Sequence, residues 1–169
     1  MKMILTMVEQ LAPDVILRGE QLFDAAADVI IGQAQRELLI FDAGLNVARY
    51  GKAQRIEMLR SFLARGPNNR LLLLLHHADS VAAHCPRLMD LMKLHSHAVS
   101  IHTTGEQAHT AQDSFILADD LHYLHRFHVD HARFRYSLNN ATLAQPLRER
   151  FGQIMETSIH GLSVTTLGL

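Results

Sequence analysis

Residues 70–76 read RLLLLLH, and this stretch decides the fold. Five consecutive leucines stand between the turn-forming residues 66–69 (GPNN) and a polar stop at His76. The run is too short to cross a membrane as a helix, and its unbroken apolar character is typical of a strand covered on both faces, as in parallel sheets. It therefore predicts the central strand of an α/β sheet.

Segments on either side of this run complete the pattern. Residues 37–41 (ELLIF) and 98–102 (AVSIH) predict further strands, and residues 114–118 and 121–127 predict a hairpin that turns at Asp119-Asp120. Apolar residues recur at helical spacing over 18–36, 51–65, 86–96 and about 140–159, with Asn139 or Asn140 as the cap of the last helix. The order favours a mixed, mostly parallel central sheet with helices on both faces.

The composition narrows the class of protein. A chain of 169 residues with 48% hydrophobic content fits one domain over residues 1–169. Its lone cysteine, Cys85, cannot form an internal disulfide, and the apolar run near the N-terminus is shorter than a signal peptide requires. A net charge of -1 gives no overall field that would attract nucleic acid or lipid. We therefore expect a cytoplasmic protein without a membrane span.

The element order and several local strings resemble one half of the phospholipase D-like superfamily, from about Gly19 to Ser158. These strings are LLIFDAGLNV, RLLLLL, AVSIH, FILADD and RERFGQIMETS. The signature of that superfamily is H-x-K-x-x-x-x-D, followed downstream by Gly-Ser-x-Asn. In this register Asp119 falls on the aspartate, Gln112 and Ser114 replace the histidine and the lysine, and residues 126–129 (RFHV) replace the downstream motif. The chain is similar to small bacterial proteins of this fold.

These replacements predict a degenerate member. The resemblance implies a histidine nucleophile and phosphate-binding lysines, and glutamine at position 112 can act neither as that nucleophile nor as a general acid. We therefore expect a non-catalytic binding or interaction module rather than an enzyme. The resemblance also implies a homodimer, because active members combine two copies of the motif. Its interface would involve the loop 103–112 and the hairpin around Asp119.

Polar residues at strand ends are the first candidates for ligand binding. Carboxyl ends of parallel strands meet at one edge of a sheet, where ligands usually bind, although a buried strand must in any case end in a polar residue. Arginine and asparagine side chains near and after the hairpin could bind an anion or a phosphate-containing ligand, although surface arginines and helix capping explain them better. Together the ligand-binding candidates are Asp42, His76, His77, His102, Arg126, Arg133, Arg135 and Asn139.

Two alternatives stay open. A phosphodiesterase or nuclease could work with rearranged catalytic residues, for which the candidates are His109, Asp113, Asp119 and His122. A regulator that responds to metal or pH could use the repeat His122-x-x-His125-x-x-His128-x-x-His131. On a strand this period of three places alternate histidines on opposite faces, so four-fold binding of one metal is unfavourable. We predict no metal and no cofactor.

Overall fold

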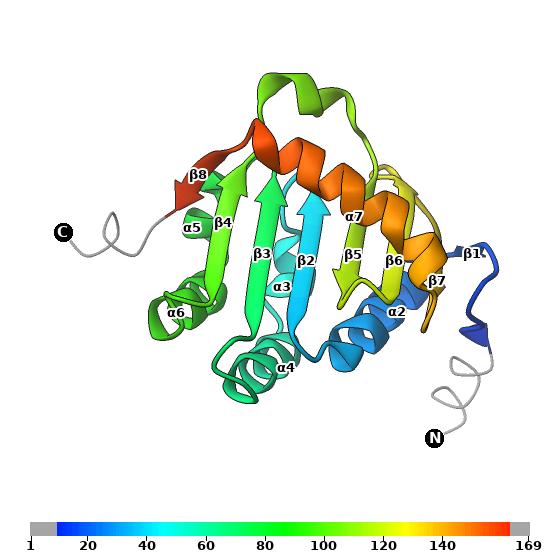
Figure 1. The fold of residues 1–169 in the computed structure, drawn as a ribbon, viewed down its shortest axis with the longest axis horizontal. Helices are drawn as coiled ribbons and strands as arrows, with labels where there is room; N and C mark the ends of the chain where they lie inside the picture. Colours follow the sequence, from blue (N-terminus) through cyan, green and yellow to red (C-terminus); the bar gives the residue numbers. More distant parts are fainter. Residues whose placement is uncertain (1–9, 163–169) are drawn as a thin grey trace.

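The structure is a computed structural model that describes residues 10–162 (Figure 1). The N-terminal apolar run considered above falls on residues 1–9 and lies outside the described residues, as do residues 163–169. No helix in the described range is long and apolar enough to cross a membrane.

One sheet of eight strands organises the chain, in the order β1-β7-β6-β5-β2-β3-β4-β8. The leucine run forms β3 at its centre, between β2 and β4, as the sequence predicts. The strands are β1 (Leu17–Arg18), β2 (Glu37–Asp42), β3 (Arg70–Leu75), β4 (Val99–Thr103), β5 (Ser114–Ala118), β6 (His122–His128), β7 (His131–Ser137) and β8 (Ile159–Leu162).

The expectation of a mostly parallel sheet is wrong. Only the pairs β2–β3 and β3–β4 are parallel, whereas the other five neighbouring pairs are antiparallel. An unbroken apolar run indicates that both faces of a strand are covered, and it does not specify the direction of the neighbouring strand. Here β5, β6 and β7 follow one another as hairpins, and the short outermost strands β1 and β8 each pair antiparallel with their neighbour.

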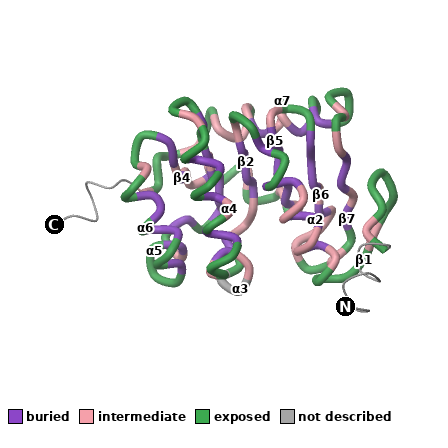
Figure 2. Tube along the Cα trace, turned by 90° about the horizontal axis from the view of Figure 1, so that it is seen from below, coloured by how far each residue is buried: buried purple, intermediate pink, exposed green. Residues whose placement is uncertain are grey.

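Helices cover both faces of the sheet, as predicted. Helices α2, α4 and α6 lie on one face and α7 crosses the other (Figures 1 and 2). The side chains of β3 divide between two cores, with Leu71, Leu73 and Leu75 packing toward the first face and Leu72 and Leu74 toward α7. The helices are α2 (Glu20–Gln33), α3 (Val47–Tyr50), α4 (Ala53–Ala64), α5 (Asp79–His84), α6 (Pro86–Leu94) and α7 (Ala141–Glu156), with a 3₁₀ turn η1 (Glu106–Thr110).

Six elements were not predicted: α3, α5, β1, β7, β8 and the turn η1. Two to six residues are too few for a hydrophobic period to emerge in β1, β8, α3 and α5. Strand β7 (HARFRYS) buries Phe134 and Tyr136 while two arginines alternate with them, so it has the strand period but a highly charged composition.

The strand ends form two opposite edges of the sheet, and these two edges carry different features. Asp42 and Leu75 end β2 and β3 at one edge, to which η1 returns, and the antiparallel β5 begins there with Ser114 (Figure 1). The β5–β6 turn at Asp119 and Asp120 lies at the other edge, where both residues have positive φ. The predicted homodimer interface joined the loop 103–112 to the hairpin around Asp119. The structure places these two segments at opposite ends of β5, and the homodimer stays a prediction.

Candidate functional site

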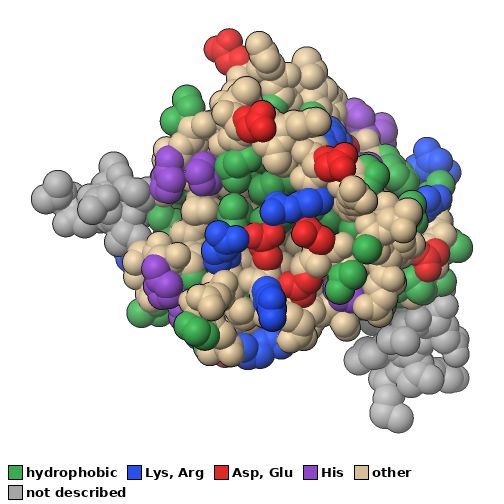
Figure 3. All heavy atoms as spheres, viewed as in Figure 1, with side chains coloured by type: hydrophobic (Ala, Val, Ile, Leu, Met, Phe, Trp, Pro, Cys, Tyr) green, Lys and Arg blue, Asp and Glu red, His purple; other side chains and the backbone are tan. Residues whose placement is uncertain are grey.

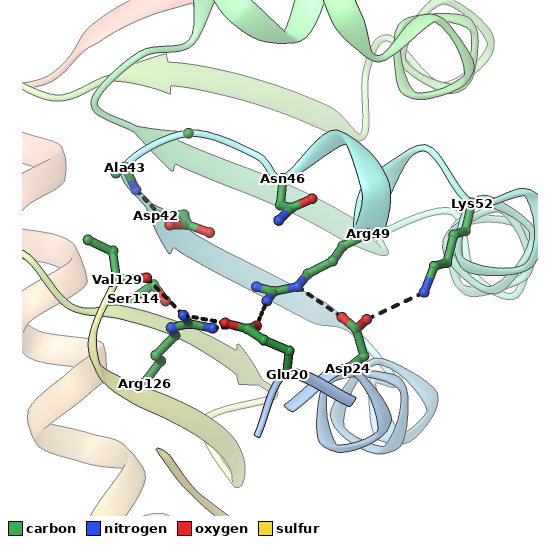
Figure 4. Close-up of a pocket in the computed structure, with 11 residues that line it drawn as sticks. Glu20, Asp24, Asp42, Ala43, Asn46, Arg49, Lys52, Ser114, Arg126 and Val129 are labelled. Atoms are coloured by element: carbon green, nitrogen blue, oxygen red, sulfur yellow. Dashed lines mark hydrogen bonds and ion pairs between the residues drawn. The ribbon is translucent and has the colours of Figure 1, made fainter. Parts of the chain in front are cut away.

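A cleft of about 460 Å³ opens at the edge where β2 ends and β5 begins. The start of α2, the β2–α3 loop, α3 with the Lys52 that follows it, the end of β6 and the β6–β7 turn contribute the rest of its wall (Figure 4). Its lining is mostly charged: Glu20, Asp24, Asp42, Ala43, Gly44, Asn46, Arg49, Lys52, Ser114, Arg126 and Val129.

Arg126 is the most firmly held cation of the cleft. Its side chain is 6% exposed and projects from β6, where Arg126 pairs with Ser114 of β5. The guanidinium donates from Nε to His128 O at 3.1 Å and from Nη2 to Val129 O at 2.8 Å. It also donates from Nη1 and Nη2 to the two carboxylate oxygens of Glu20, at 2.9 and 2.8 Å. These bonds fix the guanidinium plane at the cleft wall.

Arg49 approaches the same carboxylate from the other side. Its guanidinium bonds Glu20 through Nη2 and lies 3.0 Å from an oxygen of Asp24 through Nε. Lys52 lies 3.4 Å from Asp24, so three cations of the cleft lining converge on two carboxylates (Figure 4). Buried Arg55, outside the lining, lies 3.7 Å from Asp24 as well. Glu20 itself is 56% exposed, so it is as accessible as Lys52 at 55% and far more accessible than Asp24 at 25%.

Asp42 contributes a carboxyl group from the end of β2. The backbone N–H of Ala43 donates to it at 2.8 Å. Burial raises the pKa of Asp42 to about 6, against the opposing effects of this hydrogen bond and of the positive charge of Arg126. At neutral pH the group is therefore close to its titration range, where it can accept a hydrogen bond or, once protonated, donate one.

Three of the positions that the resemblance aligns with the superfamily motifs line this cleft. Ser114, in the place of the lysine, lines it, and so do Arg126 and Val129 from the stretch that replaces the downstream motif. Gln112, in the place of the histidine, accepts a hydrogen bond through its backbone oxygen from Val129 N at 2.7 Å. Of the ligand-binding candidates, Asp42 and Arg126 come together here.

Three other histidines cluster beyond the end of β3. The rings of His76, His77 and His109 lie 4.8 to 6.4 Å apart between centroids. Buried His76 bonds Thr104 Oγ1 at 2.6 Å and the carbonyl of Ala111 at 2.9 Å, which requires a proton on Nε2. Burial lowers the pKa of His76, so it joins the β4–β5 loop to β3 as a neutral ring. His77 and His109 are exposed.

Asp113 belongs to a separate network on the α7 face. It accepts hydrogen bonds from His125 Nε2 at 2.8 Å and from both terminal nitrogens of Arg150. Burial alone would raise the pKa of Asp113, but these bonds and the charge of Arg150 hold it far below its usual range. The Asp113 carboxylate is thus firmly ionised and ties β5, β6 and α7 together.

Asp119 and His122 lie at the opposite edge from the cleft. The Asp119 carboxylate accepts three backbone N–H groups, from residues 35 to 37, at 2.6 to 2.9 Å. His122 Nδ1 accepts the backbone N–H of Asn139 at 3.1 Å, and Asn140 caps α7 by accepting from Leu143 N. The four residues weighed as a rearranged catalytic set are therefore spread over three places in the fold.

The remaining candidates lie apart from the cleft lining. His102 stacks near His160, with ring centroids 4.8 Å apart, and burial lowers its pKa. Arg133 lies over the Phe127 ring at 5.6 Å, and Arg135 pairs with His125 across β6 and β7. Within residues 10–162 no group of three histidine, cysteine or acidic side chains is placed to hold a metal ion.

The cleft residues Glu20, Asp24, Arg49 and Lys52 were not among the sequence candidates. They lie in a helix start and in the segment after β2, where charged residues are common on any protein surface. The available signal was the position of Arg49 and Lys52 in the loop that follows a buried strand at its carboxyl end. Glu20 and Asp24 carry no such signal, since only the tertiary packing of α2 brings them to this edge.

The face that carries α7 has no expanse of one charge. Figure 3 shows lysine and arginine side chains beside aspartate and glutamate side chains over the middle of this face. Such a mixed surface gives no broad positive field for a polyanion on that side.

The chain matches one family model and is similar in fold to several solved structures. A family model described as "Domain of unknown function (DUF7931)" matches residues 19–167. A search of curated proteins finds no match to the sequence. Nuc from Salmonella typhimurium, a phospholipase D family member, is similar over 88% of this chain and 99% of its own, with 12% identity and a TM-score of 0.59. NucT from Helicobacter pylori is similar over 87% of this chain and 98% of its own, with 8% identity and a TM-score of 0.60.

A third solved structure is also similar to this chain. TrmBL2, an archaeal chromatin protein whose structure "shows a novel mode of DNA binding", gives a TM-score of 0.62 at 12% identity. The similarity covers 95% of this chain, which spans 60% of the length of TrmBL2. At these identities the likeness concerns architecture, and it shows that the chain has a phospholipase D-like fold.

Proposed function

We propose that this chain, which belongs to the family of the domain of unknown function DUF7931, is a binding module that holds a ligand by an oxyanion and does not hydrolyse it. The phospholipase D-like fold supplies the scaffold. The module is proposed to be one domain over residues 1–169, with the charged cleft at the β2–β5 edge as its site.

The pairing of Arg126 with Ser114 carries this proposal. The resemblance puts a phosphate-binding lysine at position 114, where a serine hydroxyl now stands, and the neighbouring strand supplies a guanidinium beside it. A guanidinium presents a fixed fork to carboxylate and phosphate oxygens. Arg49 and Lys52 line the same cleft, so the positive charge needed to hold an oxyanion is present without the lysine of the signature.

The chemistry of the lining favours binding over turnover. Phosphoryl transfer through a covalent intermediate needs a nucleophile and a general acid, and no histidine is among the described residues that line the cleft. The alternative phosphodiesterase would depend on His109, which lies with His76 and His77 rather than in the lining. We therefore propose binding, and not hydrolysis, as the function of the cleft.

A nucleic-acid ligand is not favoured. The similarity to TrmBL2 concerns the fold, and DNA binding is stated for that protein. The net charge of this chain is -1, whereas affinity for a duplex backbone depends on many lysine and arginine contacts. The proposal is therefore limited to a single anionic group seated in the cleft.

Titration with dimethyl phosphate tests this function. We expect saturable binding by the wild-type protein and a loss of about tenfold in affinity in Arg126→Gln, since a hydrogen bond to a charged group contributes about 1.5 to 3 kcal/mol. The control is Arg133→Gln, which removes an exposed arginine of β7 outside the cleft lining. Lys52→Gln is a second cleft variant that should also weaken binding, and its 55% exposed side chain can be removed without disturbing the core. Equal affinity in all four proteins would contradict the proposal.

A further inference from the structure

We infer that in the free protein the Glu20 carboxylate occupies the anion-binding position between Arg126 and Arg49, which we call the seat. The ligand then binds by displacing this carboxylate with a singly charged oxyanion such as a phosphodiester group. This inference rests on the proposed function, because it names the gate and the ligand class of the same cleft. Three features of the cleft support it.

The first feature is the geometry of the seat. The Glu20 carboxylate is itself an oxyanion, and Arg126 donates to its two oxygens in the forked arrangement that a phosphate would also receive. Arg49 donates to the same group from α3. An external anion cannot reach both guanidinium groups in this way while the carboxylate remains between them (Figure 4).

The second feature is an asymmetry in how the partners are held. Glu20 is the first residue of α2 and its side chain is 56% exposed, so it can rotate into solvent without opening the core. Arg126 keeps its bonds to the carbonyls of His128 and Val129 when Glu20 leaves. Arg49 keeps Asp24 and its place 4.7 Å above the Phe23 ring. The two cations therefore remain in position for a replacement anion.

The third feature is the charge of the lining. The cations Arg49, Lys52 and Arg126 face three carboxyl groups, those of Glu20, Asp24 and Asp42. With all three carboxyl groups ionised these charges cancel, and departure of Glu20 leaves one uncompensated positive charge. A singly charged anion restores the balance. A phosphate monoester with two charges would place the second beside Asp24 and Asp42, where like charges repel.

Variants of Glu20 separate the seat from general electrostatics. Glu20→Gln removes the charge that competes with the ligand, and Glu20→Asp keeps the charge but shortens its reach to the two guanidinium groups. We expect both to bind dimethyl phosphate more tightly than wild type, Glu20→Gln by about tenfold, because an occupied seat lowers apparent affinity by the fraction of protein that is competent to bind. Glu57→Gln is the matched control, since Glu57 pairs with Arg60 on α4 outside the cleft.

The measurement is calorimetric titration of the four proteins at neutral pH and low salt, with dimethyl phosphate and methyl phosphate as probes. Tighter binding by both Glu20 variants, with Glu57→Gln equal to wild type and dimethyl phosphate preferred, supports the inference. Two results would show that Glu20 is not in the seat: Glu20→Asp binds as wild type does, or all four proteins bind equally while Arg126→Gln binds more weakly. In either case only the proposed function survives. If none of the four proteins binds either probe, both proposals fail. Preference for methyl phosphate overturns the ligand class.

Discussion

Arg126 and Glu20 lie 106 residues apart in the chain, and the guanidinium of the first holds both carboxylate oxygens of the second. The pair joins β6 to the first turn of α2 across the mouth of the cleft. Its two members differ sharply in exposure, since the arginine side chain is 6% exposed and the glutamate side chain 56%. The buried member is fixed by the backbone, and the accessible member is free to exchange with a ligand.

The central strand should govern the stability of the fold. Leu73 is 1% exposed between β2 and β4, so Leu73→Ala should destabilise the protein by about 2 to 5 kcal/mol through lost burial and a cavity. Leu94→Ala is the control, because Leu94 is 69% exposed at the end of α6. Urea unfolding measures both variants. Equal free energies of unfolding for Leu73→Ala and wild type would contradict the placement of β3 in the core.

The raised pKa of Asp42 predicts a pH dependence of stability. Between about pH 4 and about pH 6 the folded state retains a proton that the unfolded state has lost, so the free energy of unfolding falls as the pH rises through this window. Asp42→Asn should remove this contribution and should gain about 1 to 3 kcal/mol relative to wild type above the window. Its amide oxygen can still accept from Ala43 N.

Unfolding of both proteins across that pH range measures the difference. A gap between Asp42→Asn and wild type that stays constant from acid to neutral pH would show that Asp42 ionises with an ordinary pKa.

Hydrolysis of phosphodiesters should be absent. Gln112 and Ser114 supply neither the nucleophile nor the lysine of the signature, and loss of either should remove most of the rate. The assay is release of p-nitrophenol from bis-p-nitrophenyl phosphate, with and without divalent metal ions. Turnover that co-purifies with the protein and disappears in His109→Ala would establish the enzyme instead.

A homodimer remains a prediction from the resemblance. If it forms through the cleft edge, exposed His109 lies near the two-fold axis, whereas His122 lies at the far edge. Charging of histidines below about pH 6 should then weaken association. Light scattering at neutral and acidic pH measures the mass. The mass of a monomer at every pH would contradict the dimer. The mass of a dimer at both neutral and acidic pH would show that His109 does not lie near the axis.

Local sequence signals predicted the parts of the fold that local chemistry determines. The five leucines predicted the central strand and Asp119-Asp120 the hairpin turn. Asn139 or Asn140 was predicted as the cap of α7, and Asn140 is the cap. The balance of parallel and antiparallel pairs was predicted wrongly, because apolar runs record burial and carry no information about the orientation of a neighbour.

The site was less accessible from the sequence. Asp42 and Arg126 were recognised as candidates, but Glu20 and Asp24 join them only through the packing of α2 against the sheet. Asp119 and His122 were weighed as catalytic residues, yet their partners are backbone N–H groups far from the cleft. Long-range contacts of this kind leave no periodicity or motif in a single sequence.

The most direct test of the account follows the side-chain Nε–H resonance of Arg126 by NMR while dimethyl phosphate is added to Glu20→Gln. We predict a saturable shift of this resonance. The Nε–H resonance of Arg150, whose two terminal nitrogens donate to Asp113 on the other face of the sheet, should stay unchanged. An unchanged Arg126 resonance under conditions where the probe binds would contradict the account, since the anion would then be held somewhere other than the cleft.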